Sequence, residues 1–337
     1  MRIARRSLPA LLAALAAAAA PPAARAQGAA AGGAAAATFP QRPPRIVVPF
    51  TPGGSPDVLA RMLADESARR WPHNGMVVEN RPGAGGNIAA EAVARSAPDG
   101  HTILLMSNNI VAVNPHIGRM PIDPLAELAP VALLARSPLV VLVGPEVPVR
   151  DLAGLLALAR ARPGEVSYAS AGQGSPHHLA MALLAQRAGV RMTHVPYRGT
   201  SPGLTDVAGG RVTAMASPVG TALPMIGEGR LRPLAAAGAA RLPWLPDLPT
   251  VAEAASLPGF DANTWLALAV PRATPPATVA TLADFAADVF GTQRAREQLD
   301  RQGIVPASGG PEELGALWRS DNAEWGGVIR NAGITAE

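Results

Sequence analysis

The chain has 337 residues, 48% of them hydrophobic, and it contains neither cysteine nor lysine. This length suggests two domains, each able to bury its own core. The missing cysteine excludes disulfides and thiolate chemistry. The missing lysine excludes a P-loop lysine, a Schiff-base lysine and a kinase-type catalytic lysine.

The positive charge of the chain is concentrated at its N-terminus. Residues 1–26 combine early arginines, an Ala/Leu run over 8–20 and a small-x-small sequence at 24–26, which is the pattern of a cleavable signal peptide. The pair Arg5 and Arg6 leaves both the general and the twin-arginine export routes open. Removal of this segment lowers the basic residues from 29 to 25, equal to the 25 acidic ones. We therefore expect a bacterial periplasmic protein without a nucleic-acid partner.

The first predicted strand, turn and helix follow an Ala/Gly-rich stretch. Residues 27–38 are predicted to form a disordered tether, because they lack the side chains that build a core. A β-branched run over 45–49 predicts a buried strand, and the apolar spacing over 57–70 predicts a helix. Between them stand two glycines, Ser55 as a predicted N-cap and Pro56 in the first turn. Such a turn presents unpaired N–H groups to an anion.

Two more strands complete the first half. A strand at 76–80 leads through the glycine-rich loop 81–87 into a helix, and a strand at 101–106 ends at a polar tip. Nearly continuous apolar strands that alternate with helices predict a parallel sheet covered on both faces. The loop begins like a dinucleotide fingerprint, but Ile88 replaces its third glycine, so we interpret it as a tight turn.

The opening pattern returns in the second half. Strands at 131–135 and 139–143 are interpreted as the end of one lobe and the crossing into another. A strand at 166–170 then leads through a loop to Ser175, Pro176 and a helix, roughly 120 residues after the first such unit. Two helix N-termini, one in each lobe, suit a clamp on a small acid. The alternative is a chance recurrence of common loop residues.

The remaining elements extend the second lobe and then return to the first. Further strands are predicted at 194–197, 212–217 and 231–237, and residues 242–249 form a proline-stiffened connector. The apolar run 265–270 is interpreted as the return crossing, and two helical segments end the chain. The predicted domains are therefore 39–140 with 266–337 for lobe 1, and 141–265 for lobe 2.

Several motifs together resemble the Bug family, the extracytoplasmic solute receptors of tripartite tricarboxylate transporters, which are type II periplasmic binding proteins. The similarity runs in the family's order from about Phe39 to the end of the chain. The motifs that carry it are Val48–Ser55, Val78–Asn87, Ala97–Gly100, Tyr168–Gly172, Gly174–Pro176, His194–Tyr197 and Leu248–Glu253.

The resemblance implies an α/β fold of two Rossmann-like lobes joined by a two-segment hinge, with the ligand between the lobes. It implies that backbone N–H groups and ordered waters hold a carboxylate without a dedicated arginine, and that the lobes close over it. The implied site residues are Thr51, Gly53, Gly54, Ser55, Asp57, Ser107 and Asn108 from lobe 1, and Ser170, Ala171, Gly172, Gln173, Ser175, His178, Tyr197 and Gly199 from lobe 2.

One position departs from the family pattern. Many members carry an aspartate in a Met-Phe-Asp-Asn stretch, where it can face an amine of the ligand, whereas this chain has Ser217 at that position. Serine cannot pair with an ammonium ion. We therefore expect Ser217 to line the site and the distal end of the ligand to be neutral or anionic.

More specific activities, such as metal binding or hydrolysis, receive little support from the sequence. His177 and His178 are neighbours on a helix and diverge by about 100°, so they cannot share a metal. A Gly-x-Ser-x-Gly elbow is missing, and Asp57 suits a capping role better than general-base catalysis. We expect a monomeric receptor, without catalysis, metal or cofactor, whose partners are a small organic acid and the membrane subunits of a transporter. The alternatives are an exported α/β hydrolase and a ligand sensor for a signalling membrane protein.

Overall fold

The computed structural model describes residues 39–50, 52–71, 74–197 and 199–335. The predicted signal peptide and tether, residues 1–26 and 27–38, lie outside the described residues. None of the helices within the described ranges has both the length and the apolar composition that a membrane span requires.

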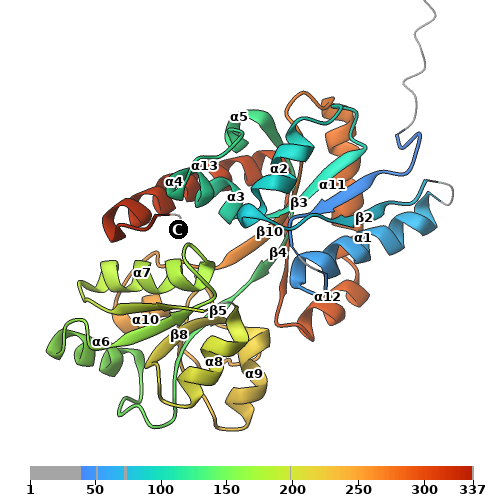
Figure 1. Cartoon of the computed structure of the whole chain (residues 1–337). Helices are drawn as coiled ribbons and strands as arrows, with labels where there is room; N and C mark the ends of the chain where they lie inside the picture. The colour runs from blue at the N-terminus through green and yellow to red at the C-terminus, as the bar shows by residue number, and fades with distance from the viewer. Residues whose placement is uncertain (1–38, 51, 72–73, 198, 336–337) are drawn as a thin grey trace, which may run out of the picture. The chain divides into compact units, whose positions relative to one another are not determined.

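Six strands form the first sheet, in the order β11-β4-β10-β3-β1-β2 (Figure 1). The strands β1, β2 and β3 pair in parallel, as the alternation of strands and helices predicts. The strand β10 is antiparallel to both β3 and β4, and β11 is antiparallel to β4. Their bounds are β1 Arg45–Val48, β2 Val77–Asn80, β3 Thr102–Ser107, β4 Leu128–Ser137, β10 Thr264–Pro271 and β11 Val305–Gly309.

Five strands form the second sheet, in the order β7-β6-β8-β5-β9. The strand β6 is parallel to β7 and β8, while β5 is antiparallel to β8 and β9. The chain passes from the first sheet to the second at Pro138 and returns just before Thr264. We call these two stretches the crossing segments, and the sheets with their helices lobe 1 and lobe 2. The bounds are β5 Leu139–Val143, β6 Ser167–Ser170, β7 Thr193–Pro196, β8 Ala214–Pro218 and β9 Arg232–Ala236.

Helices cover both sheets, and two N-termini can be compared with their predictions. Ser175 is an N-cap, as predicted, and its hydroxyl accepts from the His178 N–H. The prediction of Ser55 as an N-cap is wrong: Gly54 occupies that position and Ser55 opens the helix. The helices are α1 Ser55–Arg70, α2 Asn87–Ala94, α3 Asn109–Ala112, α4 Asn114–Ile117, α5 Pro124–Glu127, α6 Leu152–Ala161, α7 Pro176–Ala188, α8 Thr200–Ala208, α9 Val219–Gly227, α10 Val251–Ala255, α11 Pro276–Phe290, α12 Gln293–Asp300, α13 Pro311–Ala332 and the 3₁₀ helix Ala84–Gly86.

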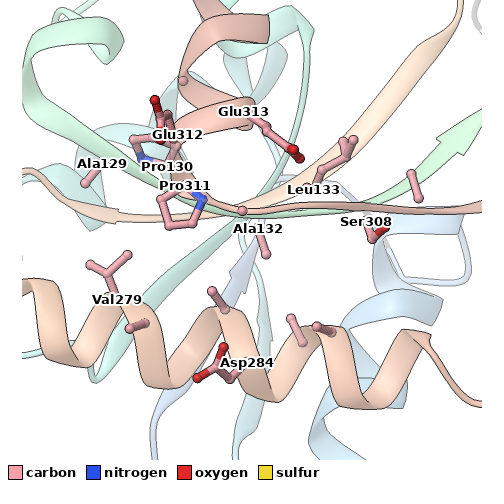
Figure 2. Close-up of a pocket in the computed structure, with 18 of the residues that line it drawn as sticks. Ala129, Pro130, Ala132, Leu133, Val279, Asp284, Ser308, Pro311, Glu312 and Glu313 are labelled. Carbon is pink, nitrogen blue, oxygen red and sulfur yellow. The ribbon is translucent and has the colours of Figure 1, made fainter.

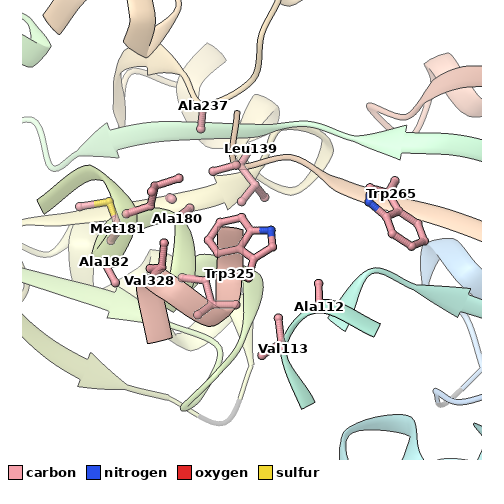
Figure 3. Packing of buried hydrophobic residues seen from close by; sticks show 14 of the residues in the cluster. Ala112, Val113, Leu139, Ala180, Met181, Ala182, Ala237, Trp265, Trp325 and Val328 are labelled. Atoms are coloured by element: carbon pink, nitrogen blue, oxygen red, sulfur yellow. The ribbon is translucent and has the colours of Figure 1, made fainter. Parts of the chain in front are cut away.

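The last helix, α13, contacts both lobes. It packs against β4 in lobe 1 and against α7 in lobe 2. Trp325 and Val328 lie beside Ala180 and Met181 of α7 (Figure 3). One cluster of buried apolar residues therefore runs from lobe 1 through α13 into lobe 2. This packing restrains the lobes beyond the two crossing segments.

The lobes also meet at Gly220, near the start of α9. A Cβ atom there would lie 2.0 Å from the carbonyl oxygen of Gln302, in the turn between α12 and β11. We expect Gly220→Ala to lower the free energy of unfolding by about 1–3 kcal/mol, because backbone must move to admit a methyl group. Gly227, in the same helix, has open space around its Cβ position. Urea unfolding should show Gly227→Ala to be neutral or slightly stabilising, and equal midpoints for both variants would contradict the predicted backbone overlap.

Candidate functional site

The loop between β1 and α1 is fixed by hydrogen bonds to the carboxylate of Asp57. This side chain is 3% exposed. Its carboxylate accepts from the Gly53 N–H at 3.0 Å, from Asn80 Nδ2 at 2.9 Å and from Arg61 Nε at 2.8 Å. The hydrogen bond from Arg61, together with those from Gly53 and Asn80, lowers the pKa of Asp57 to about 2 despite its burial. Both oxygens are used inside lobe 1, so Asp57 shapes the loop from within.

The hydrogen bonds of this loop leave specific N–H groups available. Gly53 donates to Asp57, whereas the N–H groups of Gly54 and Ser55 have no partner among the described residues. Both stand at the N-terminus of α1, where the helix dipole favours an anion. Thr51, predicted for the same site, lies outside the described residues.

A second loop system of lobe 1 is held by asparagines. The Ser107 hydroxyl donates to Asn109 Oδ1 at 2.5 Å, and Asn109 Nδ2 donates to the Gly85 carbonyl at 2.7 Å. Asn114 Nδ2 adds bonds to Gly85 at 3.0 Å and to Asn87 at 2.6 Å. The glycine-rich loop after β2 is thereby fixed to the end of β3, where Ser107 lies.

Asn108, unlike its neighbours Ser107 and Asn109, forms its hydrogen bonds with the return crossing segment and the strand that follows it. Its backbone N–H donates to the Trp265 carbonyl at 3.2 Å, and its Nδ2 donates to the Asn263 carbonyl at 3.5 Å. Its Oδ1 is buried and has no hydrogen-bond partner within the described chain. A buried acceptor of this kind normally receives a bond from water or a ligand.

The loop between β6 and α7 is folded around Ser170. Its hydroxyl donates to the Gly172 carbonyl at 3.0 Å, accepts from the Gly172 N–H at 3.1 Å and lies 2.6 Å from His194 Nε2. The Ser175 hydroxyl donates to the same carbonyl at 2.6 Å. The loop is thus closed on itself before any ligand binds.

A pair of stacked histidines supports this loop. The rings of His178 and His194 lie 3.7 Å apart at 11°, with Tyr168 stacked beside His194. His178 Nδ1 accepts from the Gly174 N–H at 3.2 Å, which places the proton of the neutral ring on Nε2. Burial, with a smaller effect of His194, lowers the pKa of His178 to about 4. His178 is therefore neutral at neutral pH.

The N–H groups of this loop divide as they do in lobe 1. Those of Gly172 and Ser175 bond within the loop and that of Gly174 bonds to His178 of α7, while those of Ala171 and Gln173 have no partner in the part of the chain that the structure describes. Each lobe thus offers two adjacent or nearly adjacent backbone donors at the end of a central strand. Backbone donors of this kind bind any carboxylate.

The other predicted residues of lobe 2 have different surroundings. The Tyr197 hydroxyl donates to Asp206 Oδ2 at 2.7 Å, and burial together with this carboxylate raises the pKa of Tyr197 to about 12. Gly199 is the N-cap of α8, with φ at 124°. Ser217 is completely buried, and its hydroxyl donates to the Pro218 carbonyl at 3.3 Å. Its hydroxyl is therefore bonded within β8.

Of the predicted site residues, Asn108 lies where the two lobes meet. Asn108 and Asn109 share a small void of about 10 Å³ with Pro176 and Leu179 at the start of α7. Close by, a Cβ at Gly174 would lie 2.9 Å from the Ile117 side chain of α4. The end of β3 thus faces the helix N-terminus of lobe 2.

Several residues of the site were missed from the sequence. Arg61 stands four residues after Asp57 on one helix face, which is a readable signal for an ion pair. Asn80 ends the strand next to β1, and its position follows once the strand order is known. For Asn114 and Asn263 the sequence carries no such signal, because their partners lie far away in the chain.

A larger cavity of about 1020 Å³ lies elsewhere in lobe 1. It is bounded by α11, β4, β11 and the start of α13 (Figure 2). Asp284 projects from α11, and Glu312 and Glu313 project from α13. None of the predicted site residues lines this cavity, so it is separate from the two loops.

The arrangement suits binding better than hydrolysis. Ser170 and His194 form a serine–histidine contact, but Ser170 is 0% exposed and its hydroxyl is bonded to its own loop. A nucleophile must reach its substrate, and this one is covered. The free groups at the surface of the two loops are hydrogen-bond donors.

Comparison with known proteins identifies the family. The chain matches the tripartite tricarboxylate transporter family receptor, TctC, over residues 59–334. The UPF0065 protein in the tcbD-tcbE intergenic region of Pseudomonas sp. (strain P51) is 40% identical over 291 residues, 86% of each chain. Protein BugT of Bordetella pertussis is 36% identical over 300 residues, 88% of this chain and 91% of BugT.

Solved structures agree with this assignment. R. palustris Rpa4515 with adipate has a TM-score of 0.76 at 36% identity, covering 88% of this chain and 99% of that one. MatC (Rpa3494) from Rhodopseudomonas palustris with bound malate has a TM-score of 0.71 at 32% identity, covering 86% and 100%. The α/β fold with two sheets is the fold of these proteins. The chain therefore belongs to the TctC family of periplasmic solute-binding receptors, which includes the Bug proteins.

Proposed function

We propose that this receptor binds a small organic carboxylate between its lobes and delivers it to a tripartite tricarboxylate-type membrane transporter. The observation that carries the proposal is a set of four backbone N–H groups, at Gly54 and Ser55 in lobe 1 and at Ala171 and Gln173 in lobe 2, that have no hydrogen-bond partner among the residues that the structure describes. They stand at the ends of central strands, beside helix N-termini. The adipate of Rpa4515 and the malate of MatC are ligands of this chemical class.

The proposed ligand carries no ammonium group near Ser217. A buried serine hydroxyl that is bonded to a backbone carbonyl offers no charge to a cation. Aspartate and glutamate should therefore bind more weakly than acids of similar length without an amine. The distal end of the ligand is then neutral or a second carboxylate.

Calorimetry with the full-length mature protein tests the proposed function. Adipate, malate, aspartate and glucose are titrated separately, and the ligand is recovered and identified afterwards. Saturable binding of adipate or malate at one site per chain, with the acid recovered unchanged, is the expected result. Binding of glucose but of no acid would reject the carboxylate, and a chemically altered acid would favour the hydrolase alternative.

Delivery to a transporter is tested separately from binding. Transport of the bound acid by reconstituted tripartite membrane subunits should require the receptor. Capture of a signalling membrane protein, with no stimulation of transport, would favour the sensor alternative.

Gly172→Ala probes the proposed donors of lobe 2. Gly172 has φ at 124°, which L-residues rarely adopt, so alanine would move the neighbouring N–H groups of Ala171 and Gln173. We expect acid affinity to fall about tenfold or more, since one charge-assisted hydrogen bond contributes about 1.5–3 kcal/mol. Gly189→Ala, at the far end of α7 with φ at 63°, is the matched control for backbone strain. Equal affinities of the two variants for the acid would contradict the role of this loop.

A further inference from the structure

The return crossing segment contains one residue, Asn263, whose side chain and backbone are together bonded to several parts of the hinge. The Leu139 N–H, directly after the first crossing segment, donates to Asn263 Oδ1 at 3.4 Å. The Asn263 carbonyl accepts from Asn108 Nδ2 at 3.5 Å, and its N–H donates to Asp261 Oδ1 at 3.0 Å. Both crossing segments and a proposed ligand-binding residue therefore meet at Asn263.

The Asn263 side chain lies against the backbone of lobe 2. A Cβ at Gly238, just beyond β9, would lie 2.1 Å from Asn263 Nδ2, so the amide occupies the space beside this glycine. The backbone on either side is also fixed, because Ala262 donates to the Ala237 carbonyl at 2.8 Å and Ala237 donates to the Leu139 carbonyl at 2.8 Å. Asn263 is thereby held against the edge of the lobe 2 sheet.

Asn108 supplies the connection to lobe 1. Its backbone N–H bonds to the carbonyl of Trp265, two residues beyond Asn263, and its side chain bonds to Asn263 itself. Its unpartnered Oδ1 lies near the small void that faces α7. A water molecule, or a hydroxyl group of the bound acid, that donates to Oδ1 would fix the Asn108 amide, and with it the hydrogen bond to Asn263.

We infer that Asn263 couples occupancy at Asn108 to the relative rotation of the two lobes, an inference that rests on the proposed function for the identity of the ligand. Lobe rotation changes backbone angles in both crossing segments. The Leu139–Asn263 bond links these segments, so they turn together. Asn263 is a positioning residue, which acts through Asn108 and Leu139.

The experiment measures the distance between the lobes directly. Because the chain has no cysteine, Asp65→Cys on α1 and Ala157→Cys on α6 give two unique labelling sites at exposed positions. Pulsed electron paramagnetic resonance then reports the distance distribution between spin labels, first without any ligand. We expect Asn263→Ala to broaden this distribution relative to the labelled protein. Asn263→Asp, which keeps the acceptor for the Leu139 N–H, should restore a narrow distribution.

A matched control variant distinguishes the specific role of Asn263 at the hinge from a general loss of rigidity in the protein. Asn74→Ala, in lobe 1, removes another single asparagine bond, to the Pro40 carbonyl at 2.9 Å, and should leave the distribution narrow. Adipate and malate are then titrated, and Asn263→Ala should weaken whichever binds by about 5- to 10-fold, the worth of one hydrogen bond. An unbroadened distribution for Asn263→Ala, or equal broadening for Asn74→Ala, overturns the inference. Failure of the labelled parent to bind either acid counts against the proposed function, while the ligand-free comparison still decides the role of Asn263.

Discussion

Asp57→Ala is expected to lower the free energy of unfolding by about 2–3 kcal/mol, because three donors lose a buried acceptor at once. The Gly53 N–H would be left unsatisfied beneath the loop, and the Asn80 amide would keep its bond to the Phe50 carbonyl and lose the one to Asp57. Arg61 contributes less to this loss, since its side chain is 55% exposed and water can replace the carboxylate. Denaturant unfolding at neutral pH measures the change. Acid affinity should fall with it, because the loop that presents Gly54 and Ser55 is no longer fixed.

The same carboxylate predicts a pH dependence. The pKa of Asp57 is lowered from 3.8 to about 2, so its stabilisation is complete above about pH 4 and is lost as the pH falls toward 2. Asp57→Ala should therefore differ most from the parent above about pH 4. Asp65→Ala, on the exposed face of the same helix, is the control and should unfold like the parent. Equal unfolding midpoints for the Asp57 and Asp65 variants at neutral pH would show that the loop does not depend on this carboxylate.

Local patterns in the sequence predicted the elements around the site well. The apolar run before Gly53, the glycines and the helix beyond them appear as β1, the loop and α1. Ser175 caps α7 as expected, and Leu179, Leu183 and Leu184 are buried on its inner face. These features depend on neighbouring residues, so spacing and residue type are sufficient to find them.

Features that depend on distant residues were not predictable in this way. Gly54 rather than Ser55 is the N-cap of α1, and Asp57 accepts from the Gly53 N–H. The sequence offers both Ser55 and Asp57 as capping residues and does not decide between them. The contact of α13 with α7 joins helices over a hundred residues apart. Which side of β8 is covered depends on the packing of the whole lobe, so the burial of Ser217 could not be read from the sequence alone.

Asp321→Asn is expected to stabilise the protein at and above neutral pH. Asp321 Oδ2 accepts from Trp265 Nε1 at 2.7 Å, beside the return crossing segment. Burial, strengthened by the charges of Glu324 and Asp261, raises the pKa of Asp321 from 3.8 to about 6, although the Trp265 bond and Arg136 oppose the shift. Between these two values the folded protein holds a proton that the unfolded chain releases. Stability therefore falls as the pH rises through this window.

The asparagine keeps an acceptor for Trp265 Nε1 and never carries the charge. The variant should exceed the parent by about 2 kcal/mol above pH 7, an estimate reduced from the full pKa difference because Asp321 is only partly shielded from water. The two proteins should converge as the pH falls below about 3, where Asp321 is neutral in both the folded and unfolded states. Asp300→Asn, at the end of α12, is the control and should show no such convergence. A difference between parent and Asp321→Asn that stays constant from pH 4 to 8 would have to come from packing, because the cost of a buried charge disappears when that charge is protonated.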